Sequence, residues 1–175
     1  MSEGAFFFDK EGTLPWTKSC FVCGESNPHG LHRRSRVEGS VVVLDYTTRS
    51  ADLGWRHLVH GGILMTLLDE VMTWAAILAS REAVVAAEMT TRLKKPVGVG
   101  ETLRVEGRVV KVGRKLVLTD GVILRGGDEV VGRASGKYFP MPGEGFRLCE
   151  GDFVSGGDAL SLEEVFGGRL GEGGR

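Results

Sequence analysis

The sequence predicts an α+β domain in which an antiparallel sheet wraps around one long, buried helix. Residues 62–79 repeat apolar side chains at the i, i+3, i+4, i+7 spacing of a helix. Few residues in this segment are strongly polar, so the helix should be buried on most of its circumference. About six other segments have the β-branched or alternating pattern of strands. Short turns join the last four of them, which favours antiparallel pairing.

Two of the expected strands precede the helix. Residues 41–48 are rich in β-branched side chains, residues 31–37 form a more polar partner, and Glu38–Ser40 supplies the turn between them. The other four strands follow the helix and are expected at residues 84–95, 102–112, 115–125 and 129–139.

The 175 residues are enough for one domain of ordinary size. We expect an N-terminal arm, a central domain and a partly mobile, glycine-rich C-terminal extension, at residues 1–18, 19–142 and 143–175 respectively.

The C-terminal extension is expected to contain a short helix and has one segment that could form an edge strand. Asp158 is placed to cap a short helix over residues 159–166, and Gly167 would end it. Residues 146–153 either add an edge strand or have no structural role.

Composition and charge exclude several classes of function. There are 22 basic and 23 acidic residues, so the chain lacks the overall positive charge that general nucleic-acid binding requires. The first ten residues lack the features of a signal peptide, and no continuous apolar run reaches the roughly 18 residues of a membrane span. Three cysteines, an odd number, argue against a secreted disulfide framework. We therefore expect a cytoplasmic protein that binds neither nucleic acid nor membrane, with Trp55 and Trp74 in its core or an interface.

The start of the helix carries the most informative residues. Gly61 and Gly62 lack side chains, so a ligand can approach their backbone closely. The first amides of a helix have no internal acceptor and lie at the positive end of its dipole, so the amide of Gly62 can donate to an oxygen that becomes negative. Asp69 lies nearly two turns later on the same face, where a carboxylate on an apolar helix suggests a chemical role. An ordinary loop followed by an Asp that pairs with a buried base remains the alternative.

The distance between these residues predicts a shared site. The helical rise from Gly62 to Asp69 is about 10.5 Å, too far for one reacting carbonyl to contact both. A two-fold dimer with antiparallel helices would bring Gly62 of one chain beside Asp69 of the other.

Four motifs occur in order along residues 19–141. They are Cys20-Phe21-Val22-Cys23-Gly24 with Asn27-Pro28-His29-Gly30-Leu31, then His60-Gly61-Gly62 with Asp69, then Ala86 to Val97, then Gly100-Glu101-Thr102-Leu103 with Val110 to Arg114. Together they resemble the hotdog-fold acyl-CoA thioesterases, in the phenylacetic-acid-type (PaaI-like) branch. The first motif resembles a subgroup with a Cys-x-x-Cys-Gly…Asn-Pro-x-Gly-Leu start.

This resemblance implies a fold, a reaction and a set of roles. The fold would be a hotdog, a sheet wrapped round a central helix and continued across a homodimer or a dimer of dimers. The reaction would be hydrolysis of acyl-CoA, with Asp69 as general base or nucleophile and Gly62 as the oxyanion donor. His60 and Gly61 would shape the mouth of the pocket. The substrate's CoA would contact the turn that contains Lys111, Gly113, Arg114 and Lys115. No metal or redox cofactor is implied.

One position departs from the family pattern. Members often carry a Ser or Thr on the third strand that helps to orient the attacking water, and the matching residue here is Ala86. Either Thr90 or a neighbour takes that role, or turnover is slow. The departure also keeps open a non-catalytic, acyl-CoA-sensing module as the main rival.

Two further patterns are weaker. Cys20 and Cys23, followed by His29 and His32, have the residue types of a zinc site, but structural sites normally space their second pair farther away. We expect a pair of thiols covering the end of the sheet. The spacing of Asp52 and His57 resembles that of hotdog hydratases, without their Asn-Pro, and makes an enoyl-CoA hydratase a third alternative.

Overall fold

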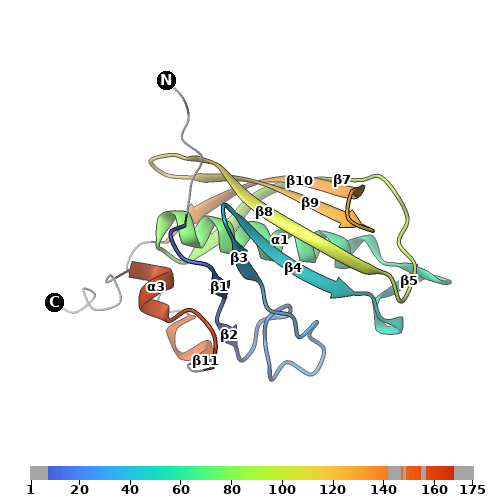
Figure 1. Ribbon diagram of the computed structural model, residues 1–175, viewed down its shortest axis with the longest axis horizontal. Coiled ribbons are helices and arrows are strands. Elements are labelled where there is room, and N and C mark those ends of the chain that lie inside the picture. Colours follow the sequence, from blue (N-terminus) through green and yellow to red (C-terminus); the bar gives the residue numbers. More distant parts are fainter. Residues whose placement is uncertain (1–7, 142–146, 148, 155–156, 168–175) are drawn as a thin grey trace.

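The computed structural model describes residues 8–141, 147, 149–154 and 157–167. It confirms the expected architecture, because a seven-stranded antiparallel sheet wraps around the long helix α1 (Gly61–Ser80), as Figure 1 shows. In spatial order the strands are β1 (Gly12–Thr13), β3 (Arg36–Glu38), β4 (Val41–Thr47), β8 (Thr102–Val112), β9 (Val117–Arg125), β10 (Glu129–Pro140) and β7 (Val84–Leu93).

Shorter elements surround this layer. Their bounds are β2 (Trp16–Thr17), paired with β11 (Phe153–Val154); β5 (Leu53–Trp55), paired with β6 (Leu58–Val59); the single turns η1 (Ser50–Asp52) and η2 (Glu150–Asp152); and the helix α3 (Leu162–Phe166). The segment that precedes β3 and the α3 region lie below the sheet in Figure 1, against the helix side of the domain.

The strand expected at residues 31–37 is shorter than predicted. Only Arg36–Glu38 pairs with β4, and Gly39 adopts a positive φ of 57° in the predicted turn. The amides of Leu31 and Arg33 bond instead to the carbonyls of Phe21 and Val22. Leu31 and Arg33 therefore hydrogen-bond to the preceding loop, although the sequence predicted that they pair within the sheet.

The N-terminal arm packs against the domain over its described part. Leu14 is fully buried and Phe8 is 5% exposed, and β1 pairs with β3 at the edge of the main sheet. The apolar side chains of this segment cover the core next to α1, which keeps it packed. Residues 1–7 lie outside the described residues.

The C-terminal extension contributes a capped helix. Ser161, rather than Asp158, caps α3, and its capping box with Glu164 supplies both reciprocal bonds. Gly167 ends the helix as predicted, and Asp158 pairs with Arg34. Residues 153–154 add no edge to the main sheet, because they pair with β2. Residues 142–146, 148 and 168–175 lie outside the described residues.

The sheet contacts α1 most closely at two glycines. Gly107 on β8 and Gly121 on β9 are register partners on the helix-facing side. A Cβ on Gly107 would lie 2.5 Å from the carbonyl oxygen of Val71, and one on Gly121 would lie 2.9 Å from Leu68. Only glycine at these positions lets the sheet wrap tightly around the helix.

Helix α1 is long and apolar enough to cross a membrane by length and composition alone, with a mean hydropathy of 1.5. More than half of that window, 56%, is buried inside the domain. A core helix passes the same test, so these properties follow from the position of α1 within the sheet.

Candidate active site

The N-terminus of α1 follows the short hairpin of β5 and β6. His60 adopts an extended conformation as the N-cap, and its Nδ1 accepts a hydrogen bond from the amide of Gly62 at 2.8 Å. The amide expected to hold an oxyanion is therefore engaged by His60. The amide of Gly61 has no acceptor among the described residues. Rotation of the His60 imidazole would free Gly62 for a ligand oxygen.

An open groove lies beside this helix start. It is formed by the β5–β6 hairpin, the first turn of α1 and the segment that follows β7, and its lining includes Trp55, Leu58, Gly61, Leu64, Leu93, Lys94 and Lys95. Trp74 is in the core as expected, whereas Trp55 is 83% exposed on this groove. The groove combines apolar surface with two lysines, which suits a ligand with an apolar chain and an anionic group.

Asp52 has a structural role. It is 1% exposed, and its carboxylate accepts from the Tyr46 hydroxyl at 2.5 Å and from the backbone and guanidinium of Arg49. Burial opposes ionisation, but these hydrogen bonds hold the pKa of Asp52 below its usual value. Because its acceptors are engaged and His57 is exposed, this geometry gives no support to a hydratase pair.

We expect Asp52→Ala to lower the free energy of unfolding by about 3 kcal/mol, because it removes the acceptor of the buried Tyr46 hydroxyl and the ion partner of Arg49. Urea denaturation followed by circular dichroism measures the change. Asp45→Ala is the matched control, since Asp45 pairs with Arg36 at an exposed position and should contribute no more than about 1 kcal/mol. Equal losses for the two variants would contradict the structural role.

Asp69 lies on the middle of α1, facing β10. The hydroxyl of Tyr138 donates to Asp69 Oδ1 at 2.7 Å, and the Asp69 side chain is half-buried. Burial and the nearby carboxylate raise the pKa of Tyr138, so its hydroxyl stays protonated and remains a donor. Asp69 Oδ2 has no partner among the described residues, which leaves it able to take a proton from a ligand or a water.

The second carboxyl of α1 is that of Glu70, which is buried. Its side chain is 8% exposed and accepts from the indole Nε1 of Trp74 at 2.9 Å. Burial raises the pKa of Glu70 to about 8. Asp69 and Glu70 are adjacent in sequence but rotated by about 100°, so they contact different environments.

A β-bulge separates Ala86 from Thr90. Lys137 pairs with Glu88 and Tyr138 pairs with Ala86, so Ala87 is an extra residue on β7. Ala86 therefore shares the helix-facing side with Tyr138, whereas Thr90 pairs with Ser135 on the outer face. Thr90 therefore cannot orient a water at Asp69 of its own chain, whereas the hydroxyl of Tyr138 hydrogen-bonds to that carboxylate.

The turn expected to contact CoA is the exposed tip of the β8–β9 hairpin. The amide of Gly113 donates to the carbonyl of Leu116, and the side chains of Lys111, Arg114 and Lys115 are exposed. Within the described part of the chain none of these three cations makes an ion pair. In Figure 1 the tip lies at the opposite end of the sheet from β5 and the start of α1. In one chain, the hairpin tip and the helix start are therefore far apart.

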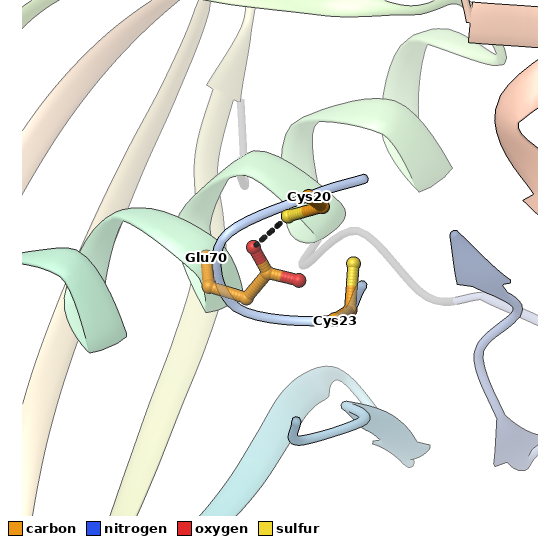
Figure 2. A group of neighbouring side chains, drawn as sticks. All are labelled: Cys20, Cys23 and Glu70. Atoms are coloured by element: carbon orange, nitrogen blue, oxygen red, sulfur yellow. Dashed lines mark hydrogen bonds between the residues drawn. The ribbon is translucent and has the colours of Figure 1, made fainter. Parts of the chain in front are cut away.

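His29 and His32 do not lie with the two cysteines. Cys20 and Cys23 converge on Glu70, with their ligand atoms within 4.8 Å of one another, as Figure 2 shows. His29 is exposed, and His32 has a positive φ of 52°. Neither belongs to this group of described residues. All three cysteines of the chain are unbridged.

Residues 57–132 match the family model described as "Thioesterase superfamily". The PaaI protein of E. coli, from the phenylacetic acid degradation operon, is 23% identical over 63% of this chain and 80% of that chain, with a TM-score of 0.58. The fold is the hotdog fold. A hypothetical thioesterase of Streptococcus pneumoniae, solved with coenzyme A, is 22% identical over 58% of this chain and 82% of that chain, with a TM-score of 0.55.

A third similar structure extends over more of the chain. Smu.793 of Streptococcus mutans, solved bound to acetyl CoA, is 18% identical over 79% of this chain and 94% of that chain, with a TM-score of 0.56. No curated protein sequence matches the chain significantly. The solved structures confirm the hotdog fold.

Sequence reasoning missed two residues of this hotdog domain. Tyr138 lies 69 positions after Asp69, and only the register of β10 brings it to the helix. Glu70 has no role in the sequence prediction, although the Trp74 indole one turn later is a local signal for a buried partner.

Proposed function

We propose that this chain hydrolyses acyl-CoA thioesters to a free acid and CoA. The observation that carries the proposal is the arrangement around Asp69, a half-buried carboxylate. Tyr138 donates to one of its oxygens, and the other has no partner among the residues that the structure describes. The match of residues 57–132 to the thioesterase superfamily and the CoA-containing structures of similar fold support the substrate class.

The reaction we propose breaks the C–S bond of the thioester. Asp69 accepts a proton from a water that attacks the carbonyl carbon, or attacks that carbon itself and forms an anhydride that water then opens. The carbonyl oxygen becomes negative and accepts from an amide at the start of α1. The sulfur leaves as a thiolate and takes up a proton as CoA is released. This route requires no metal or redox cofactor.

The proposed site is shared between two copies of the chain. Strand β7 is a ten-residue edge strand, and its side chains Val85, Ala86 and Ala87 are exposed. A long unpaired edge with apolar side chains is a template for another strand. Pairing of two β7 strands would continue the sheet and bring the helix start of one copy toward Asp69 of the other, which the separation of about 10.5 Å within one chain requires.

The CoA moiety would lie between the groove and the hairpin of neighbouring chains. The phosphates of CoA are anionic, and Arg114 and Lys115 at the hairpin tip are exposed cations able to pair with them. The apolar groove next to Gly61, on the other copy, would take an extended chain. His60 would then rotate away from Gly62 as the thioester carbonyl takes its place.

Tyr138 is a positioning residue in this proposal. We expect Tyr138→Phe to lower kcat by about 10-fold with little change in KM, because Asp69 loses the hydrogen bond that fixes its orientation. Steady-state kinetics with an acyl-CoA substrate measure both parameters. A rise in KM with an unchanged kcat would contradict the positioning role.

Release of free thiol from a panel of short, medium, long and aryl acyl-CoAs tests the function. Turnover of at least one substrate supports the hydrolase. Binding of these esters without thiol release would contradict it and favour an acyl-CoA sensor. Loss of an enoyl-CoA chromophore without thiol release would favour a hydratase.

A further inference from the structure

Three potential metal ligands meet at one point outside the proposed active site. Cys20 and Cys23 approach from the loop before β3, and Glu70 approaches from the middle of α1, as Figure 2 shows. All three donor atoms lie within 4.8 Å of one another. We propose that Cys20, Cys23 and Glu70 bind one zinc ion.

The loop that carries the thiols has the form of a metal-binding turn. The amide of Val22 donates to Cys20 Sγ at 3.3 Å, and the amide of Gly24 donates to the carbonyl of Cys20 at 3.0 Å. The Val22 amide favours the thiolate of Cys20, which is the form that binds metal, and the Gly24 amide closes the turn. A Cβ on Gly24 would lie 2.2 Å from the Cys20 carbonyl oxygen, so the turn closes only with glycine there. The glycine that directly follows Cys23 is thus required by the geometry of the turn.

The separation of the ligands suits a tetrahedral ion. Cys20 Sγ and Glu70 Oε2 are 3.9 Å apart. Bonds of about 2.3 Å to sulfur and about 2.1 Å to oxygen place two ligand atoms about 3.6 Å apart on zinc. Small side-chain rotations close the difference. The fourth position remains for a water or for the hydroxyl of Thr17, which is 3.6 Å from Cys23 Sγ.

Glu70 is buried and makes no ion pair with Arg, Lys or His in the described part of the chain. The indole of Trp74 donates to one of its oxygens, and the thiol of Cys20 donates to the other. A bound metal ion would displace the protons of the two thiols and of this carboxyl. Thiolate ligands select a soft or borderline ion such as Zn²⁺ over Mg²⁺ or Ca²⁺.

The ion would tie the N-terminal loop to α1. Cys20 lies 50 positions before Glu70, so coordination closes a long loop onto the helix at the residue next to Asp69. The inference does not rest on the hydrolase reaction, because Glu70 lies with the two cysteines, whereas Tyr138 hydrogen-bonds to Asp69.

The first test is the metal content of the full chain. Protein purified with zinc and then freed of unbound ions should hold about one zinc per chain by elemental analysis. Replacement of zinc by Co²⁺ should give the near-ultraviolet charge-transfer absorption of thiolate-bound cobalt. Chelation should lower the midpoint of thermal unfolding by roughly 5 to 10 °C. A chain that holds no zinc, or that joins Cys20 to Cys23 in a disulfide after purification under reducing conditions, would overturn the proposal.

Matched variants locate the ion. Cys20→Ser and Glu70→Gln should each weaken zinc affinity by at least about 10-fold, measured by competition with a chromophoric chelator. Asp69→Asn and Cys149→Ser are the controls, because neither residue belongs to the cluster. Their zinc content should equal that of the parent chain. If Glu70→Gln keeps the parent affinity, Glu70 is not a ligand and the proposed site is wrong.

Discussion

Asp69→Asn is expected to lower kcat/KM for acyl-CoA hydrolysis by about 10²- to 10⁴-fold. Asparagine keeps an oxygen that accepts from Tyr138, so the fold and the local hydrogen bond survive. It can neither take a proton from water nor attack the carbonyl as a carboxylate does. Free-thiol release with the best substrate of the panel measures the loss. Asp120→Asn, on the outer face of the sheet, is the control and should keep the parent rate.

Mixing two inactive variants tests whether the site is shared. Gly62→Pro removes the amide at the second position of α1, where a first-turn proline is tolerated. Co-refolded with Asp69→Asn, it should form mixed dimers in which one of the two sites has both groups intact. Random pairing then restores about a quarter of the parent activity. Recovery of no activity, with mixed dimers present, would show that Gly62 and Asp69 act within one chain and would contradict the shared site.

Gly107→Ala is expected to lower the free energy of unfolding by about 3 kcal/mol. The new Cβ would lie 2.5 Å from the carbonyl oxygen of Val71 and 2.9 Å from the amide of Met72, which are backbone atoms of α1 and cannot rotate aside. The sheet and the helix must therefore separate locally. Thermal unfolding should show the loss as a fall in the midpoint of roughly 6 to 12 °C.

The control for this substitution is Gly151→Ala, since a Cβ at Gly151 meets no atom within 4 Å. It should change the free energy of unfolding by no more than about 0.5 kcal/mol. Equal stability of Gly107→Ala and Gly151→Ala would show that β8 does not approach the helix as closely as the structure has it.

The sequence by itself determined the local elements. The apolar period of residues 62–79 predicted α1, which runs from Gly61 to Ser80, and the alternation of residues 102–112 predicted β8 with the observed bounds. These patterns depend on which side chains share a face within a few residues, so they can be read from short windows of sequence. The same helical period also predicts that Gly62 and Asp69 lie on the same face of α1.

Only the tertiary structure determined which residues that are distant in the sequence come into contact. Ala86 and Thr90 are four residues apart and would share a face of a regular strand, but the bulge at Ala87 puts them on opposite faces. That bulge and the register of β10 bring Tyr138 to Asp69, and the fold of the N-terminal loop brings Cys20 and Cys23 to Glu70. Each of these contacts depends on long-range packing. A shift of one residue in the register of a strand moves every side chain of that strand to the opposite face, and the local sequence pattern does not determine the register.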